Sequence, residues 1–411
     1  MHPTTEQEPQ DIDQIQYRGT YLYPTEVGFE LIQDATIIVQ DGEIVSIAQT
    51  IDTAIPITHP GCVWIPGLVD SHLHFPQTNI TGSASGPLIP WLNTSVFPEE
   101  SRFSDPKYAR MVAKEFCSRM IAAGTTTAFM YSSAHPQATD ILFEELSQSG
   151  LRAYAGMTLM NRNAPPEVLL DTLEAKRAAE QLIQKWHNKD KGRIQYVVTP
   201  RFAISCTQDM LEMAAQLCAD YDLWMQTHLS ENIDEIAFTK DLFPFSSSYT
   251  SLYNDMGLLH KKSIFAHCIH LCDEEWASLK EANAVVAHCP DSNFFLGSGG
   301  MKLSKTSKFG IDVMMGSDIG AGRTFSIPIT TGRAYDNALL QNYPITSEEL
   351  LHIACVQSRK RLGIMSEADF SVIAIGSLID KKSIIDAILF RHDHSSVQAT
   401  YVRGKELQHN A

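Results

Sequence analysis

The feature that most constrains this chain is an ordered series of histidine and carboxylate residues, each at the end of a short apolar run. The series begins with His72 and His74 and continues with His228, His267 and Asp318. Side chains two positions apart on a strand point to the same face, so His72 and His74 can aim at one point. A lone His-x-His pair is typical of packed or solvated histidines. The ordered set of five predicts instead one site built on several strand ends.

From Pro66 onward, strand-like runs alternate with helix-like runs, a pattern typical of βα units and a parallel sheet. Eight such strands are the number found in a (β/α)8 barrel, whose catalytic groups lie at the carboxyl ends of the strands. The expected strands are 63–74, 125–131, 152–159, 194–199, 223–228, 263–267, 284–288 and 311–318.

Both ends of the chain have a β-like pattern of their own. Near the N-terminus, two alternating runs flank Asp41-Gly42, a strong hairpin signal. Near the C-terminus, the apolar runs 387–390 and 399–402 suggest two further strands. We therefore predict an α/β fold, a distorted (β/α)8 TIM-type barrel with a small discontinuous β-sandwich domain built from both termini. The predicted ranges are 1–66 and 377–411 for the small domain and 67–376 for the barrel.

A long connection, residues 76–104, follows the first expected barrel strand. It contains several glycines and prolines and an apolar patch around Trp91. Loops of this length are usually functional or disordered. The apolar content favours a packed lid, and we expect Trp91 to contact the substrate.

The composition narrows the classes of function. The formal net charge of −16 argues against binding to nucleic acid or to an anionic membrane. The N-terminal residues lack the apolar core of a signal peptide, and no apolar run is long enough to span a bilayer. Eight scattered cysteines without a Cys-x-x-Cys motif indicate free thiols in a reducing compartment, so a cytoplasmic location is expected.

The candidate metal ligands form a mixed nitrogen and oxygen set. Imidazoles from His72, His74 and His228 with the Asp318 carboxylate suit zinc, iron or another divalent first-row metal. Such an ion lowers the pKa of water to about 7, which provides a hydrolytic nucleophile without a serine or cysteine.

Two further residues are candidates for proton transfer. Glu231 lies three positions after His228 and can move a proton between water and substrate, although alone it would suggest a solvated loop glutamate. His267 is either a fourth imidazole ligand or a group that orients the water. We favour the second role, because three histidines and Asp318 already form a protein ligand set.

With these residues in place, the sequence resembles the amidohydrolase superfamily from Pro66 through Asp318. Within that superfamily it is similar to the guanine deaminase family. The matching pieces are Phe75-Pro76-Gln77, Thr199-Pro200-Arg201-Phe202, Thr227-His228-Leu229-Ser230-Glu231-Asn232 and Ala287-His288-Cys289-Pro290-Asp291-Ser292-Asn293.

The resemblance implies a metal-dependent aminohydrolase of purine catabolism, which takes guanine as a small-molecule substrate and forms a homodimer. It implies one Zn²⁺ per chain, with Fe²⁺ as the alternative, because Arg201-Phe202 stand where the binuclear branch needs a carboxylated lysine. The residues to which it gives roles are His72, His74, His228 and Asp318 as ligands, Glu231, His267 and Asp318 in catalysis, and Gln77, Arg201 and Phe202 in substrate binding.

The chemistry of the base agrees with this assignment. Guanine presents O6 and N7 as adjacent acceptors that an arginine matches with two N–H donors, whereas adenine places an amino donor at the O6 position. The amide of Gln77 carries both an acceptor and donors, so it can contact N1–H and O6. In the expected reaction water attacks C2, Asp318 takes a proton, Glu231 protonates N3, and ammonia leaves xanthine.

Three alternatives stay open at this point. A related deaminase acting on 8-oxoguanine, a pterin or a triazine would use the same metal residues. A catalytically inactive barrel that serves assembly would keep the fold, although the complete set of ligands and Glu231 argues against it. Arg201 could also pair with an acidic loop residue and only brace its strand end. The nucleotide-editing zinc deaminases are excluded because the Pro-Cys-x-x-Cys motif is absent.

Overall fold

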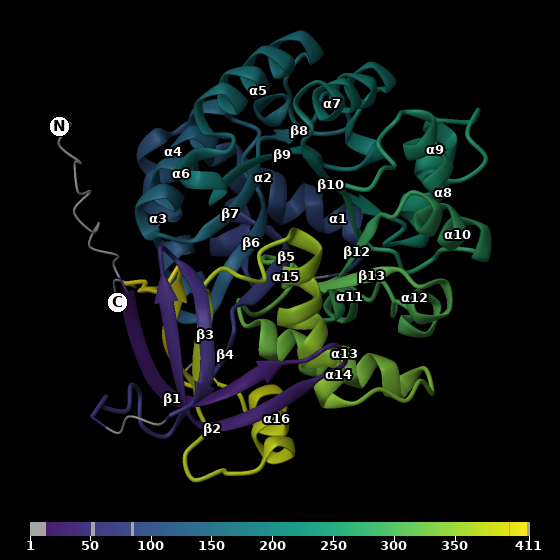
Figure 1. The fold of residues 1–411 in the computed structure, drawn as a ribbon. Coiled ribbons are helices and arrows are strands. Elements are labelled where there is room, and N and C mark those ends of the chain that lie inside the picture. Colours follow the sequence, from purple (N-terminus) through teal and green to yellow (C-terminus); the bar gives the residue numbers. More distant parts are fainter. Residues whose placement is uncertain (1–13, 51–53, 84–85, 394, 409–411) are drawn as a thin grey trace, which may run out of the picture.

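The structure is a computed structural model that describes residues 14–50, 54–83, 86–393 and 395–408. Two sheets organise the described chain, one within a barrel of strands and helices and one formed by the chain ends (Figure 1). The outermost parts of the predicted small domain, residues 1–13 and 409–411, lie outside the described residues.

The barrel is a nearly closed ring of eight parallel strands, which confirms the predicted (β/α)8 architecture. Alternate side chains such as Val69, Phe129 and Val285 fill its interior, while the other face of the sheet packs on the helices. A short additional strand of two residues, β8 (Thr158–Leu159), pairs with β9. In order around the ring the strands are β5 (Leu68–His74), β6 (Thr125–Tyr131), β7 (Arg152–Gly156), β9 (Ile194–Pro200), β10 (Trp224–Leu229), β11 (Ser263–His267), β12 (Val285–His288) and β13 (Asp312–Met315).

Hydrogen bonds from β5 to the last residue of β13, and between β5 and the residues that follow β13, join the first and last strands at their carboxyl ends. The Ser71 hydroxyl donates to the Met315 carbonyl at 2.9 Å, and the Asp318 N–H donates to the His72 carbonyl at 2.7 Å. The His74 N–H donates to the Ile319 carbonyl at 2.9 Å. This closure places the His-x-His pair beside Asp318.

Helices between the strands cover the barrel. In α3, the Asp105 side chain accepts a hydrogen bond from the Lys107 N–H and caps the helix, while Val112, Phe116 and Met120 are buried on one face. Among the described residues, none of the helices is both long enough and apolar enough to cross a membrane. The helices are α3 (Pro106–Ala122), α4 (Pro136–Ser149), α5 (Thr172–Trp186), α6 (Lys189–Gly192), α7 (Gln208–Tyr221), α8 (Ile233–Leu242), α9 (Tyr249–Asp255), α10 (Asp273–Glu281), α11 (Pro290–Phe295), α12 (Leu303–Phe309), α13 (Ile327–Leu340), α14 (Ser347–Leu351) and α15 (Ser358–Leu362).

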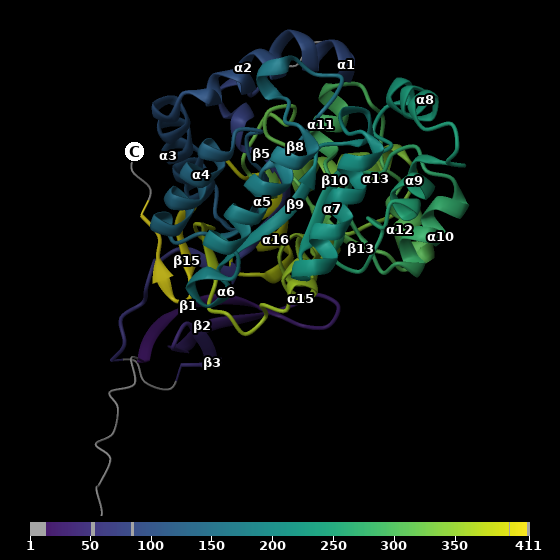
Figure 2. The same cartoon turned by 90° about the horizontal axis from the view of Figure 1, so that it is seen from above.

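The connection after β5 forms a lid of short helices. They are η1 (Phe75–Ile80), α1 (Leu88–Trp91), η2 (Leu92–Val96), α2 (Phe97–Ser101) and η3 (Arg102–Ser104). Leu88, Trp91 and Phe97 pack with Phe202 in one apolar cluster, so the described part of the connection is a packed lid as expected. Figure 2 shows α1 and α2 at one end of the molecule and β1, β2 and β3 at the opposite end.

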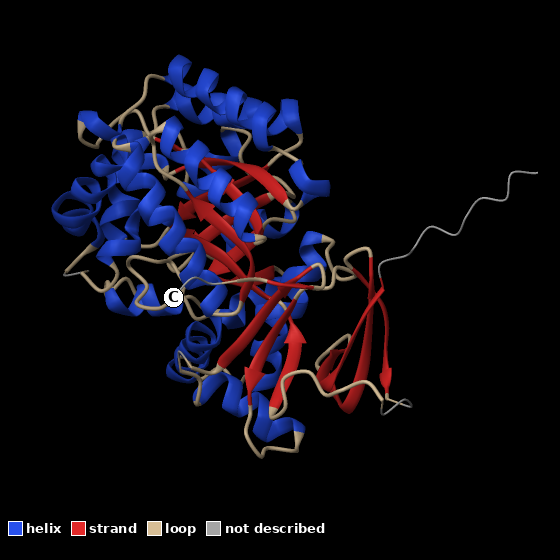
Figure 3. Cartoon of the chain, turned by 90° about the vertical axis from the view of Figure 1, so that its left-hand side faces the viewer, coloured by secondary structure: helices blue, strands red, loops and turns tan. Residues whose placement is uncertain are grey.

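The second sheet is built from both chain ends and lies apart from the barrel strands (Figure 3). Although Tyr17 of β1 and Tyr401 of β15 belong to non-adjacent strands, their ring centroids lie 5.3 Å apart, so the sheet curls around a core of its own. Its strands, in the order of the sheet, are β16 (Lys405–Glu406), β15 (Val397–Val402), β14 (Phe370–Ala374), β4 (Cys62–Pro66), β1 (Gln14–Pro24), β2 (Phe29–Gln40) and β3 (Glu43–Gln49).

The structure corrects three details of the sequence interpretation. Run 387–390 is not a strand but the end of helix α16 (Lys381–Phe390), which the Asp380 side chain caps. Strand β14 belongs to the small sheet, although it lies inside the range predicted for the barrel. The expected strand 63–74 divides at Gly67, where an added Cβ would lie 2.3 Å from Thr126 Oγ1 and the chain passes from the small sheet into the barrel.

Candidate active site

Three histidines and one aspartate meet at the carboxyl end of the barrel. His74 Nε2 lies 3.2 Å from His228 Nε2 and 3.4 Å from Asp318 Oδ1, and His72 Nε2 lies 3.3 Å from the same oxygen. All of these side chains are almost completely buried except that of His228, which is partly buried. The nitrogen and oxygen atoms therefore surround one small volume at the end of β5, β10 and β13.

This cluster fits a divalent cation. Ligand atoms about 2.0–2.1 Å from a tetrahedral Zn²⁺ lie roughly 3.4 Å from one another, which matches the observed separations. The Arg201 carbonyl lies 2.6 Å from His228 Nδ1, so this nitrogen donates and His228 Nε2 carries a lone pair that faces His74 Nε2. Burial lowers the pKa of His74 and His228 well below the ordinary value, so both imidazoles are neutral, as metal ligation requires. His72 Nε2 is buried with no hydrogen-bond partner among the described residues.

The backbone at two of the strand ends adopts a strained conformation. His267 has a φ of 73° and Asp318 a φ of 51°, in the left-handed region that residues other than glycine seldom occupy. Such residues cost of the order of 1–3 kcal/mol each and persist only where the surroundings hold them. Both side chains line the cavity at this end of the barrel.

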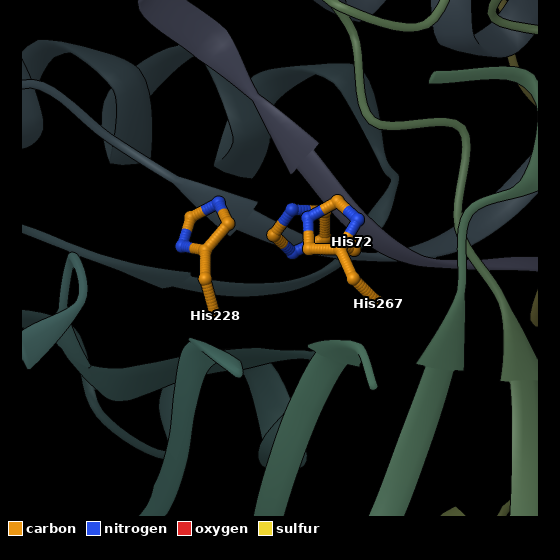
Figure 4. A group of neighbouring side chains, drawn as sticks. All are labelled: His72, His228 and His267. Atoms are coloured by element: carbon orange, nitrogen blue, oxygen red, sulfur yellow. The ribbon is translucent and has the colours of Figure 1, made fainter. Parts of the chain in front are cut away.

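His267 lies beside the metal ligands with a defined tautomer. Its Nδ1 lies 2.8 Å from Asn293 Oδ1 and donates to it, which leaves Nε2 pointing to the site. Figure 4 shows the His267 ring near those of His72 and His228, and one ring nitrogen of each lies within 4.8 Å of the others. His267 Nε2 is also 3.7 Å from Glu231 Oε2. This position suits either a further metal ligand or a group that orients the water.

Glu231 is a buried carboxyl group at the edge of this cluster. The Ser298 hydroxyl donates to Glu231 Oε1 at 2.9 Å, and its Oε2 faces His267. Burial raises the pKa of Glu231 above the ordinary value, the nearby Asp318 carboxylate adds to the rise, and His267 opposes it. A carboxyl group with a raised pKa binds a proton more readily than an ordinary glutamate, which suits a general acid–base role.

A small cavity of about 20 Å³, roughly the space of one water molecule, lies beside the cluster. Phe202 and Trp91 contribute aromatic walls, and the indole N–H of Trp91 has no acceptor among the described residues. The residues predicted from the sequence that line the cavity are His74, Gln77, Trp91, Arg201, Phe202, His228, Glu231, His267 and Asp318. His72 lies buried beneath it, so the structure brings all ten predicted residues together.

Arg201 reaches the cavity and also pairs with a lid residue that the sequence interpretation did not assign. Its Nη1 donates to both oxygens of Glu100, at 2.9 and 2.8 Å, and Gln77 Nε2 donates to the same carboxylate at 3.1 Å. The alternative in which Arg201 pairs with an acidic loop residue is therefore observed, in a pair that borders the substrate cavity.

Three residues near the site were given no role from the sequence. Asn293 belongs to a segment that supported the family resemblance, so its motif was visible although its contact with His267 was not. Ser298 lies in a glycine-rich turn with no recognisable signal. Glu100 lies 101 positions from Arg201, and no local pattern marks so distant a pair.

Comparison with known proteins agrees with the fold and the site. The sequence pattern of the amidohydrolase family matches residues 63–407, most of the chain. The chain therefore belongs to the amidohydrolase family, whose members are metal-dependent hydrolases, and it is a hydrolytic aminohydrolase.

Its relatives narrow the class further. The chain is 36% identical over 415 residues to the guanine deaminase of Escherichia coli strain K12, covering 93% of each chain. It is 31% identical to the guanine deaminase of Dictyostelium discoideum over 84% of this chain and 82% of that one. Among solved structures, a guanine deaminase from C. acetobutylicum with bound guanine has a TM-score of 0.92 and 30% identity, covering 96% of this chain and all (100%) of that one.

Proposed function

We propose that this chain catalyses the hydrolytic deamination of guanine to xanthine and ammonia. The observation that carries the proposal is the cavity in which Arg201, Gln77 and Phe202 border the three-histidine and aspartate cluster. The similarity to guanine deaminases over most of the chain supports the same substrate.

A divalent ion held by His72, His74, His228 and Asp318 would activate a water molecule by lowering its pKa to about 7. The water oxygen adds to C2 of the base, and Asp318 accepts one water proton, which later reaches the departing amino group. Glu231 supplies the N3 proton and recovers a proton from the C2 hydroxyl. The C2–N2 bond then breaks, and ammonia and xanthine leave.

The hydrogen-bond donors that Arg201 presents to the cavity favour guanine over other bases. Nε–H and Nη2–H of Arg201 share one edge of the guanidinium, and neither has an acceptor among the described residues. Two parallel donors match O6 and N7, which are neighbouring acceptors on guanine. Phe202 provides an aromatic surface beside the base, and its ring centroid lies 6.2 Å from that of His228.

Zinc is the metal that we propose, one ion per chain, with Fe²⁺ as the alternative. Neutral imidazoles and a carboxylate at tetrahedral spacing support zinc. A cytoplasmic location is supported by the free state of all eight cysteines, and a role in purine catabolism follows from the proposed substrate. A homodimer is supported by exposed apolar side chains on and after α8, among them Ile233 and Phe245, and sedimentation measurements would test it.

One assay tests the substrate. The purified protein is incubated with guanine, 8-oxoguanine, a pterin and a triazine, and ammonia release is followed. We expect the highest kcat/KM with guanine. A higher value with one of the other compounds would assign the site to a related deaminase, and no release from any of them would favour an inactive barrel.

A further inference from the structure

The lid carries a carboxylate that binds both polar residues of the substrate cavity. Glu100 lies on α2 and is only 3% exposed. Its oxygens accept two hydrogen bonds from Arg201 Nη1, and one of them also accepts a hydrogen bond from Gln77 Nε2. These contacts join residues 23 and 101 positions apart, so one carboxylate links the lid, the start of the connection after β5 and the end of β9.

The contact with Glu100 fixes which end of the Gln77 amide faces the cavity. A carboxylate only accepts hydrogen bonds, so the amide must turn its NH₂ group toward Glu100. The Gln77 Oε1 atom then remains without a donor among the described residues, and Gln77 lines the cavity. The side chain therefore presents an acceptor to the ligand, which matches an N–H group of the base.

The contact with Arg201 has a similar consequence. Because Nη1 is committed to Glu100, the edge formed by Nε and Nη2 is the edge left for a ligand. The carboxylate also balances the guanidinium charge, as suits a cavity that receives a neutral base and not an anion. The cavity thus presents an acceptor beside two donors, the complement of N1–H, O6 and N7 along one edge of guanine.

We propose that Glu100 is the positioning residue that sets this donor and acceptor pattern and thereby determines the preference for a 6-oxopurine. The proposal rests on the proposed function, because it concerns how the same cavity selects its base. Without the carboxylate, the Gln77 amide can turn over and Arg201 can rotate, so the pattern along the base edge is lost.

The neighbouring residue Glu99 provides a matched control. It lies on the same helix, is 6% exposed, and pairs with Arg102 at 2.8 Å and with the Tyr108 hydroxyl. Neither partner lines the cavity. If a buried lid carboxylate only stabilises the lid, Glu99→Gln and Glu100→Gln should have similar effects on catalysis.

The test compares kcat/KM for guanine and for 2-aminopurine, which keeps the amino group at C2 but lacks the 6-oxo group and the N1 proton. Glu100→Gln should lower kcat/KM for guanine by roughly ten- to a hundredfold, mainly through KM, because hydrogen bonds to charged groups are lost or misaligned. The 2-aminopurine value should stay constant or rise, because a turned Gln77 amide can donate to the bare N1. Glu99→Gln should leave the ratio of the two values unchanged.

A swapped double variant keeps the test decisive if Glu100→Gln folds poorly. In Glu100→Gln/Gln77→Glu the amide at position 100 donates to the carboxylate at 77, whose second oxygen again faces the base as an acceptor. This variant should regain much of the guanine preference. Suppose that the wild type deaminates guanine but the ratio is unchanged in Glu100→Gln, or the double variant does not recover it. Either result would overturn the role of Glu100 and leave the proposed function standing. Failure of the wild type to deaminate guanine would overturn the proposed function itself.

Discussion

The two ends of the barrel bury carboxylates in different surroundings. At the amino ends of the strands, Asp369 accepts hydrogen bonds from Arg152 Nε at 3.1 Å and Arg359 Nη1 at 3.2 Å. At the carboxyl ends, Asp318 faces imidazoles, including those of His72 and His74 at 3.3 and 3.4 Å. Among the described residues, no lysine or arginine forms an ion pair with Asp318.

The difference separates a structural charge from a functional one. The carboxylate of Asp369 has its countercharges inside the protein, and these arginines hold its pKa below the ordinary value despite complete burial. Asp318 and Glu231 lie among imidazoles instead: burial lowers the pKa of His74 and His228, whereas Glu231 and Asp318 raise the pKa of His267 against the effect of burial. The nearby His72 Nε2 has no hydrogen-bond partner among the described residues. Buried carboxylates without a lysine or arginine partner are stabilised when a cation binds beside them, and this site is therefore suited to bind a cation and a substrate.

The largest effect is expected for Glu231→Gln, which keeps the size of the side chain but removes the exchangeable proton. General acid–base groups contribute roughly 10²–10⁴-fold, so kcat for guanine should fall by about that factor. Metal content, measured by elemental analysis, should stay the same because Glu231 is not one of the four proposed ligands. A near-normal kcat would show that another group moves the proton.

At the opposite end, Asp369→Asn should affect stability and leave the chemistry intact. The change removes the negative charge that faces two buried arginines, and breaking a buried ion pair costs about 3–5 kcal/mol in the free energy of unfolding. Urea denaturation measures the loss, and kcat of the folded fraction should match the wild type. Asp273→Asn, which loses surface pairs with the partly exposed Lys305 and the exposed Lys308, is the control and should have a much smaller effect. A selective loss of kcat in Asp369→Asn would remove the distinction between the two ends.

A smaller effect, confined to substrate choice, is expected for Arg201→Met. Losing the charged donors should reduce kcat/KM for guanine relative to 2-aminopurine by roughly ten- to a hundredfold, without loss of metal. Arg102→Met, which breaks the more exposed pair with Glu99 on the same helix as Glu100, serves as the control. An unchanged ratio would mean that Arg201 only braces its strand end through Glu100.

The site residues that could be predicted from the sequence are those whose positions follow from the local pattern of apolar and polar residues. Strand ends could be read from apolar runs, so the meeting of His72, His228 and Asp318 followed from the geometry of a barrel. The short run 387–390 was misassigned because four apolar residues fit a strand or a buried helix equally well. The wider spacing of Ile384, Ile385, Ile388 and Leu389 is helical, and it is these residues that are buried in α16.

Contacts between distant segments could not be predicted in this way. Glu99 and Glu100 are adjacent acidic residues with the same local pattern, yet one pairs with Arg102 and the other with Arg201. The division at Gly67 likewise depends on the approach of Thr126, which no property of the strand itself reveals. Tertiary packing decides both features, and only the structure shows it.

The central claim is that the carboxyl end of the barrel holds one divalent ion and uses it to deaminate guanine. The most direct measurement removes metal with a chelator, adds Zn²⁺ stepwise and follows xanthine formation, with His72→Ala as the variant that should lose most of its bound metal. Activity should rise in proportion to added zinc and reach its plateau at about one ion per chain. A plateau at two ions per chain, or full activity in the metal-free protein, would contradict the account.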